Sequence, residues 1–223
     1  MQLVLTSAVL IEAYKQGLFP MAYSAGSPFI HWVCPEMRGQ LSIPDLHISK
    51  SLKKEVNKAL KNPDIEIKID SAFEDVIRGC AQENASRPET WINEQIIEAF
   101  TMLHENGYAH SVEYWKNSTL QGGLYGLKIG GLFCGESMFS RTSNASKICL
   151  VHLAARLWKG GFQILDTQFT NDHLEQFGVY EIPHKTYVQA IKKAASLNTD
   201  WELQGISEQI LIQDYFEMKK AGK

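Results

Sequence analysis

The sequence has no long apolar run, no paired cysteines and no large excess of charge. Its apolar stretches fall far short of the roughly 18 to 20 residues that a membrane-spanning helix needs. The start of the chain lacks a basic segment followed by a long apolar stretch and a small-residue cleavage site. The four cysteines are widely scattered without a CxxC pair, which favours reduced and mostly buried thiols. We therefore expect a cytoplasmic protein without a membrane span or a disulfide framework.

Metal sites and broad attraction to nucleic acid are also disfavoured. The seven histidines show no spacing typical of metal ligands, so we expect neither a metal nor another cofactor. The formal net charge of −3 over 223 residues gives no overall attraction to a polyanion. Any binding of nucleic acid must therefore come from a local basic surface.

The first third of the chain predicts a small N-terminal domain at residues 1–63. A helix is expected over residues 7–17, and residues 19–44, which are rich in proline, glycine and aromatics, should be irregular or form short strands. Ser49 is expected to cap a second helix that ends at Lys61 and has one apolar face. The opposite face carries a stripe of lysines, namely Lys50, Lys53, Lys54, Lys58 and Lys61.

From residue 64 the pattern predicts an α+β domain that extends to residue 195. The expected elements are a strand at 64–69, a helix at 71–80 that opens with a capping box, a helix at 93–106, strands at 108–115, 120–127 and 131–138, a helix at 144–159, a strand at 162–168, a helix at 172–177, a strand at 179–182 and a helix at 184–195. This order is typical of the GCN5-related N-acetyltransferases, in which helices flank a mixed sheet. Residues 196–223 should form a helical extension.

Two apolar segments of this domain are interrupted by polar residues that a core would not choose. Glu136 lies within Phe133–Arg141, and Asp166 and Gln168 lie within Leu165–His173. Burying such groups is costly unless they have partners, so we expect them to face a functional site. Asp166 and Gln168 are two apart on a strand and should therefore point to the same face. A satisfied polar pair at a strand end, or a solvent-facing Glu136 on an edge strand, would be the structural alternatives.

The segment Ser140–Lys147 bears on the nature of the donor. Acetyltransferases of this fold hold the pyrophosphate of coenzyme A on a glycine-rich turn at this place, where backbone N–H groups open the next helix. The segment contains no glycine, which argues against coenzyme A and leaves an acyl donor open. Its hydroxyl and basic groups would suit a phosphate or a ribose, although a simple polar loop fits equally well.

Eight segments, in order along the chain, together resemble one known family. They are Ala13–Pro20, Leu46–Ser49, Thr90–Ile92, Gly107–Glu113, Gly122–Gly126, Phe133–Ser140, Asn144–Lys147, and Leu165–Gln168 with Asn171–Leu174. From about residue 8 to 190 the chain resembles the leucyl/phenylalanyl-tRNA–protein transferases. The resemblance implies transfer of Leu or Phe, with Met as a further candidate, from aminoacyl-tRNA to the N-terminal Lys or Arg of an acceptor protein. That transfer marks the acceptor for the N-degron pathway.

The resemblance also implies roles for individual residues. Asp166 would orient an amine and stabilise charge on it, and Gln168 would position the amine or the ester. Glu136 would help to hold the aminoacyl-adenosine end of the donor, and Trp91 would lie against the terminal adenine. The other donor-binding positions implied are Ser137 and three that line the amino-acid pocket, Leu124, Met138 and Leu150. Taken alone, Trp91 would more often be a core residue, and any of the three apolar residues could also be core.

The lysine stripe on residues 50–61 would contact tRNA phosphates, with Arg141 and His47 as weaker candidates. A solvated helix face is the alternative. The chain departs from the family at Met21, where a Trp is common, at Thr167, where a Cys is usual, and in beginning near the first helix without a Gly-Gly-Asp-Leu-like segment. Two other functions stay open, an acyl-coenzyme A N-acyltransferase of the same fold and an inactive module that binds tRNA or peptide.

Overall fold

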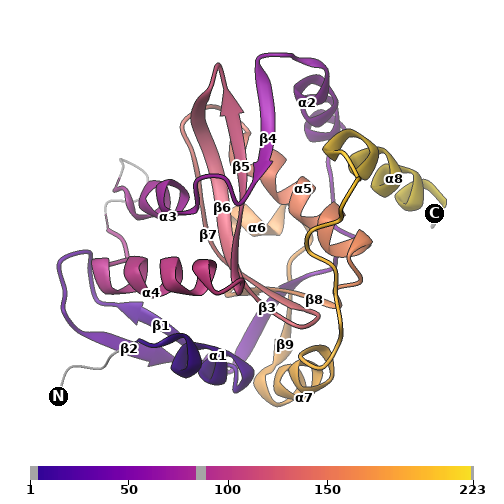
Figure 1. Ribbon diagram of the computed structural model, residues 1–223. Helices are drawn as coiled ribbons and strands as arrows, with labels where there is room; N and C mark the ends of the chain where they lie inside the picture. The colour runs from indigo at the N-terminus through magenta and orange to yellow at the C-terminus, as the bar shows by residue number, and fades with distance from the viewer. Residues whose placement is uncertain (1–4, 84–88, 222–223) are drawn as a thin grey trace.

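A seven-stranded mixed sheet forms the centre of the molecule in the computed structural model, which describes residues 5–83 and 89–221 (Figure 1). The expectation about a secretion signal falls partly on residues 1–4, which lie outside the described residues. In spatial order the strands are β4 (Ile65–Ile69), β5 (Ala109–Lys116), β6 (Thr119–Ile129), β7 (Leu132–Ser140), β8 (Ile164–Gln168), β3 (Met37–Leu41) and β9 (Tyr180–Pro183). Neighbours are antiparallel except β7 and β8, which run parallel.

Helices cover both faces of the sheet, and each face has its own apolar core. The helices on one face are α1 (Ser7–Lys15), α3 (Phe73–Ala81), α4 (Glu94–Glu105) and α7 (His184–Ala194). The helices on the other face are α2 (Lys50–Lys61), α5 (Ala145–Lys159) and α8 (Glu208–Ala221), with the short α6 (Asp172–Glu175) nearby. A separate two-stranded sheet pairs β1 (Phe19–Ala22) with β2 (Ile30–Val33). The expected mixed sheet flanked by helices is thus confirmed.

Local signals placed several helix ends correctly. The Ser49 side chain accepts a hydrogen bond from the Leu52 N–H at 3.1 Å and caps α2, whose buried residues Leu52, Val56 and Ala59 share the predicted face. The Asn93 side chain caps α4 in the same way through the Ile96 N–H. An N-cap acceptor satisfies a donor that the helix leaves unpaired, so these two positions carry a strong local signal.

The predicted capping box is wrong because a tertiary partner replaces the local one. Ser71 and Glu74 do not form a capping box; instead the Ala72 N–H at the start of α3 donates to the Glu113 carboxylate at 2.8 Å. Asn144 precedes α5 in a left-handed conformation and makes no side-chain cap. A buried acceptor on a neighbouring strand can therefore satisfy a helix start without any local sequence pattern.

Strand β3 joins the main sheet between β8 and β9, although the sequence assigned residues 37–41 to an N-terminal domain. Helix α2 likewise packs against α5 in one of the two cores. The expected division at residue 63 therefore does not coincide with the limits of the sheet. Gly39 allows β3 to approach the end of β8 closely, because a Cβ at this position would lie 2.7 Å from the backbone of Phe169.

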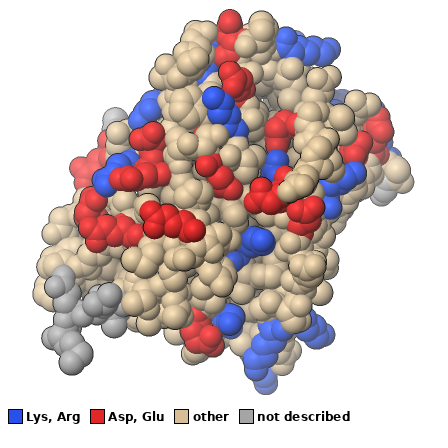
Figure 2. Space-filling view, in the orientation of Figure 1, with Lys and Arg blue, Asp and Glu red and all other residues tan. Residues whose placement is uncertain are grey.

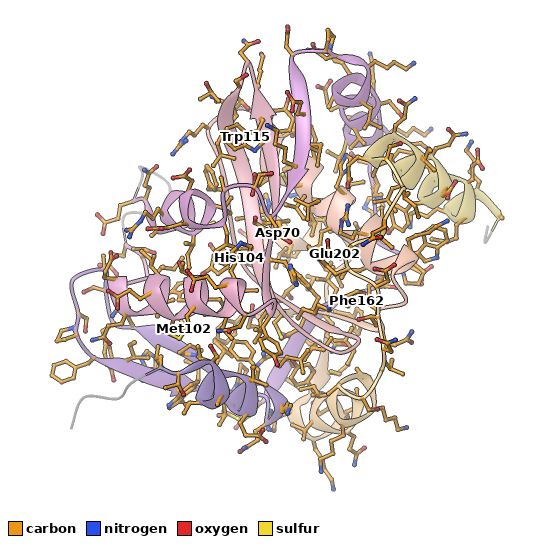
Figure 3. All side chains as sticks on the ribbon, in the orientation of Figure 1. Asp70, Met102, His104, Trp115, Phe162 and Glu202 are labelled. Atoms are coloured by element: carbon orange, nitrogen blue, oxygen red, sulfur yellow. The ribbon has the colours of Figure 1, made fainter. Side chains whose placement is uncertain are left out.

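The C-terminal segment is tied to the rest of the molecule by buried polar groups. Asp70, labelled at the centre of Figure 3 close to His104, accepts hydrogen bonds from Trp201 Nε1 at 2.9 Å and pairs with His110 Nδ1 at 2.8 Å. Glu208 at the start of α8 pairs in the same manner with Arg156 and His152 of α5. Within the described ranges, no helix is both long and apolar enough to cross a membrane.

Candidate active site

A cavity of about 1170 Å³ opens where strands β7 and β8 separate. The two strands pair only between Leu132–Cys134 and Ile164–Asp166, and β7 then continues to Ser140 paired with β6 but no longer with β8. Side chains from both faces of the sheet line the resulting gap, including Gln168, Glu136 and the apolar residues Leu124 and Leu150. The cavity therefore joins a polar region to an apolar hollow.

A β-bulge directs Glu136 toward this cavity. Gly126 of β6 pairs with Gly135, and the preceding Tyr125 pairs with Ser137, so Glu136 is the extra residue on β7. A bulge bends the strand locally and re-aims the side chain that it carries. Glu136 Oε1 accepts hydrogen bonds from Tyr14 Oη at 2.8 Å and from Gln168 Nε2 at 3.2 Å. Two of the three polar residues singled out in the sequence thus meet in the structure.

Burial raises the pKa of the Glu136 carboxyl from 4.5 to about 8. The hydrogen bond from Tyr14 opposes the rise, whereas the nearby charge of Asp166 adds to it and that of Arg38 reduces it. The same burial, together with Glu136, raises the pKa of Tyr14, so this phenol remains a hydrogen-bond donor. A carboxyl with such a pKa exchanges its proton near neutral pH, as acid–base groups of active sites often do.

Gln168 is held in an uncommon backbone conformation at the end of β8. Its φ angle is +58°, in the left-handed region that side chains other than glycine rarely adopt. A second bulge precedes it, because Gln40 pairs with Asp166 and Gly39 with Gln168, which leaves Thr167 as the extra residue. The Gln168 N–H donates to Asp166 Oδ1 at 3.1 Å. The two residues are therefore linked through the backbone, and simple strand alternation does not describe them.

Asp166 is fully buried and does not line the cavity, in contrast to the expected direct contact with an amine. Arg38 binds both of its oxygens, through Nε at 2.8 Å and Nη2 at 2.7 Å. Tyr187 Oη donates to Asp166 Oδ2 at 2.8 Å. Together with the Gln168 N–H these contacts occupy the whole carboxylate. Asp166 therefore holds the backbone N–H of Gln168 and does not border the cavity itself.

The apolar end of the cavity contains the three predicted pocket residues, Leu124, Met138 and Leu150. Four further leucines line the cavity, and sequence reasoning did not identify them, namely Leu41, Leu153, Leu165 and Leu174. Nothing in the sequence distinguishes these leucines from ordinary core residues. Such an apolar hollow suits an apolar or aromatic side chain.

Trp91, Ser137 and Arg141, which the resemblance assigns to donor or tRNA binding, also line the cavity. Trp91 is half-buried, and its carbonyl accepts the Ala22 N–H at 3.1 Å, which fixes it to strand β1. Arg141 donates to the Leu120 carbonyl at 3.0 Å. Met21, which replaces a common Trp of the family, lies on β1 outside the residues that line the cavity.

The lysine stripe lies on the outer face of α2, away from the cavity. Its members surround a shallow depression, namely Lys50, Lys53, Lys54, Lys58 and Lys61. Figure 2 shows basic side chains at the upper edge of the molecule, where α2 lies, and acidic ones over α3 and α4. The segment before α2 contacts the end of α6, since the His47 N–H donates to the Phe177 carbonyl at 3.0 Å. Because Leu174 of α6 lines the cavity, α2 begins close to its rim.

Sequence reasoning missed the three residues that hold the polar groups in place. Tyr14 was expected only within the helix over residues 7–17 and the family-like segment Ala13–Pro20, and Arg38 and Tyr187 carried no local signal. Tyr14 of α1 and Arg38 of β3 lie 122 and 128 residues from their partners in the chain, and Tyr187 of α7 lies 21 residues after Asp166. In the part of the chain that the structure describes, no group of three or more His, Cys, Asp or Glu side chains is arranged to hold a metal ion.

The raised pKa of Glu136 makes stability depend on pH. Between about 4.5 and 8 the folded protein holds a proton that the unfolded chain has lost, so stability falls as the pH rises through this range. The carboxamide that Glu136→Gln introduces cannot ionise. We therefore expect the Tm advantage of this variant over the wild type to grow from pH 5 to pH 8 and then level off. Thermal unfolding at a series of pH values measures it.

The exposed Glu98 of α4 supplies the control for this experiment. Glu98→Gln should change Tm little at any pH, because surface substitutions usually alter stability by less than about 0.5 kcal/mol. A Tm difference between wild type and Glu136→Gln that stays constant from pH 5 to pH 9 would contradict the raised pKa.

Comparison with known proteins identifies the family. Residues 40–192 match the family described as leucyl/phenylalanyl-tRNA protein transferase, and residues 4–36 match its N-terminal domain. A leucyl/phenylalanyl-tRNA–protein transferase of Paramagnetospirillum magneticum is 49% identical over 197 residues, which cover 88% of this chain and 92% of the relative. The enzyme of the same name from Rhodospirillum rubrum is 45% identical over 88% of this chain and 91% of the relative.

A solved structure of a conserved protein of unknown function from Bacteroides thetaiotaomicron aligns with a TM-score of 0.36 and 11% identity, over 86% of this chain and 62% of that one. A similarity of this size does not bear on the fold. The two curated relatives and the two adjacent family matches cover almost the whole chain. The chain therefore belongs to the leucyl/phenylalanyl-tRNA protein transferase family.

Proposed function

We propose that the protein transfers Leu or Phe, and Met as a further candidate, from aminoacyl-tRNA to the N-terminal Lys or Arg of acceptor proteins. The transfer would mark those acceptors for degradation through the N-degron pathway, and it would take place in the cytoplasm, where aminoacyl-tRNA is available. The observation that carries the proposal is the cavity in which the Glu136–Gln168 pair adjoins a hollow walled by leucines and a methionine. Membership of the family supports the reaction class.

The apolar hollow would receive the side chain of the donor amino acid. Leu124, Met138 and Leu150 supply no charged group, so selection there would depend on size and shape. Such pockets discriminate only about 1 to 3 kcal/mol per methylene. A donor range that includes several apolar side chains unbranched at Cβ is therefore the expected outcome.

The proposed reaction is aminolysis of an ester. The neutral α-amine of the acceptor attacks the ester carbonyl carbon, a new C–N bond forms, and the bond from that carbon to the ribose oxygen breaks. The proton lost by the amine ends on the released ribose hydroxyl, so atoms and charge balance without ATP or a metal. An unperturbed α-amine has a pKa of about 7.7 to 8.0, which leaves a usable neutral fraction. Positioning of amine and ester can contribute about 7 to 11 kcal/mol.

The polar groups of the cavity have separate roles in this proposal. The carboxamide of Gln168 contacts the amine or the ester, because it lies at the cavity wall. Glu136 holds the aminoacyl-adenosine end of the donor, and Ser137 lies beside it on β7. Trp91 offers a ring for the terminal adenine, since bases stack readily on aromatic side chains. Asp166 acts through the backbone of Gln168.

We also propose that the sheet is of the acetyltransferase type, a fold that raises the question of which acyl donor the protein uses. The meander β5–β6–β7, followed by α5 and the parallel strand β8, supports a sheet of the GCN5-related acetyltransferase type. An acyl-coenzyme A donor remains the alternative for such a fold. The absence of glycine from residues 140–147 and the apolar hollow beside the Glu136–Gln168 pair favour aminoacyl-tRNA.

One assay distinguishes these donors. The protein is incubated with radiolabelled Phe-tRNA or with radiolabelled acetyl-coenzyme A and an acceptor peptide bearing N-terminal Arg. We expect label on the peptide from the tRNA only. Label from the thioester alone would support the acyltransferase alternative, and label from neither would indicate an inactive binding module. An N-terminally acetylated copy of the peptide, which has no free amine, is the control and should stay unlabelled.

We also predict that the outer face of α2 contributes to tRNA binding. Lys54 and Lys58 are both exposed there, and each can neutralise one phosphate. Lys54→Glu/Lys58→Glu should weaken tRNA binding most at low salt, because counterion release makes such contacts salt-dependent. Titration of labelled tRNA at two salt concentrations measures the effect. Lys192→Glu/Lys193→Glu, at the exposed end of α7, serves as the matched control, and equal low-salt affinity of wild type and α2 variant would contradict this surface.

A further inference from the structure

A fully buried ion pair lies beside the cavity and contributes no surface to it. Arg38 of β3 and Asp166 of β8 both have side chains that are 0% exposed. Every group at the guanidinium edge has a defined partner: Nε and Nη2 bind the two oxygens of Asp166, and Nη1 donates to the Gly17 carbonyl at 2.8 Å. The rings of Phe19 and Tyr187 lie 4.8 and 4.6 Å from the guanidinium carbon. Arg38 is therefore fixed on all sides.

A buried ion pair of this kind is not an effective way to stabilise a fold. Removing both charges from water is costly, and well-packed apolar residues often do as well or better in the same space. Burial by itself would lower the pKa of Arg38, but the Asp166 carboxylate raises it, so the guanidinium keeps its charge. Arg38 also presents a rigid planar fork that holds a carboxylate at two points, which a point charge cannot do. The arrangement therefore fixes the orientation of the carboxylate.

The orientation of this carboxylate matters because of what Asp166 holds. Its Oδ1 accepts the Gln168 N–H at 3.1 Å, and that N–H belongs to a residue with φ of +58°. A left-handed backbone at a residue other than glycine persists only where surrounding contacts determine it. In this conformation the Gln168 carboxamide reaches Glu136 at 3.2 Å and borders the cavity.

We infer that Arg38 is a positioning residue for aminoacyl transfer. Its guanidinium orients the Asp166 carboxylate, the carboxylate holds the backbone of Gln168, and that backbone directs the carboxamide into the cavity. Arg38 touches no substrate in this scheme. The inference rests on the proposed function in so far as Gln168 serves the transfer, but the effect on the Gln168 backbone can be measured without any substrate.

The experiment compares the wild type with Arg38→Met and Arg38→Lys. Arg38→Met should lower kcat for transfer from Phe-tRNA by about 100-fold, the size of effect expected from a misplacement near 1 Å, and leave the donor KM unchanged. Arg38→Lys keeps the positive charge but lacks the planar guanidinium, so its kcat should lie between those of the wild type and Arg38→Met. Hydrogen exchange at the Gln168 amide, followed by NMR, should be faster in both variants.

Arg156→Met is the matched control. Arg156 is another buried arginine that pairs with a carboxylate, Glu208, and lies over a tryptophan ring, but it belongs to the contact between α5 and α8. Its loss should lower Tm while leaving kcat of the folded enzyme and exchange at Gln168 as in the wild type. A purely structural role for Arg38 would give the same behaviour in Arg38→Met.

The inference is overturned if folded Arg38→Met keeps wild-type kcat, if its kcat falls without faster exchange at Gln168, or if Arg156→Met loses kcat to the same extent. If Arg38→Met does not fold, Arg38→Lys takes its place. A lower kcat together with faster exchange at the Gln168 amide would then support the inference, and wild-type values of both would overturn it. Should the wild type not transfer from Phe-tRNA, the proposed function fails. Exchange at the Gln168 amide then still decides whether Arg38 positions this residue.

Discussion

Replacement of Asp166 by alanine is expected to abolish transfer and to lower the free energy of unfolding by about 3 to 5 kcal/mol. The variant leaves the guanidinium of Arg38 buried without its counterion, since both side chains are fully shielded from water. It also releases the Gln168 N–H and the Tyr187 hydroxyl from their acceptor. The lysines of α2 are untouched, so affinity for tRNA should persist. Urea unfolding, transfer of labelled Phe and tRNA titration measure the three effects.

A double variant separates stability from activity. Arg38→Met/Asp166→Ala removes the uncompensated charge as well as the carboxylate, and it should be more stable than Asp166→Ala alone. Transfer should remain absent, because the backbone of Gln168 still has no acceptor to hold it. Wild-type turnover in Asp166→Ala would contradict this account of the buried pair. So would a double variant whose loss in the free energy of unfolding equals the sum of the losses in Arg38→Met and Asp166→Ala.

The sequence predicted most of the elements of the fold because their signals are local. The apolar period of α4 and α5 and the three-strand meander β5–β7 need only neighbouring residues to be recognised. The place of β3 could not be predicted, because its partners β8 and β9 follow it by more than a hundred residues. A five-residue strand in a segment rich in proline and glycine carries no information about so distant a pairing.

The sequence could indicate the residues of the candidate site but not the hydrogen bonds and ion pairs that connect them. Glu136, Asp166 and Gln168 stood out because a charged or amide group within an apolar strand must have a partner or a function. The partners, Tyr14 and Arg38, lie 122 and 128 residues away in the chain, so no spacing rule connects them. This is why the sequence assigned Asp166 to the reacting amine, whereas the structure places it against Arg38.

Two bulges also lie beyond what a strict two-residue period can predict. The extra residue on β7 is Glu136 itself, and the extra residue on β8 is Thr167, between the two predicted catalytic positions. Bulges re-aim side chains and are frequent next to active sites. The alternation rule therefore gave an incomplete account of how these residues meet.

Replacement of Gln168 by alanine is the sharpest test of the chemistry, because it removes the amide that contacts Glu136 and borders the cavity. Losing a positioned hydrogen-bonding group of this kind lowers kcat by roughly 10²- to 10³-fold in other enzymes. We expect a loss of that size with little change in donor KM, since the pocket and the basic surface are intact. Stability should change little, because alanine faces the same backbone strain at φ of +58°.

Gln168→Asn and Gln163→Ala complete the test. Asparagine tolerates the left-handed backbone better than glutamine, but its shorter side chain should not reach Glu136, so kcat should be nearly as low as in Gln168→Ala while Tm is maintained. Gln163 is exposed just before β8, and its loss should leave kcat unchanged. If Gln168→Ala instead raised donor KM at constant kcat, the carboxamide would serve only to bind the donor, and its role in bringing amine and ester together would have to be abandoned.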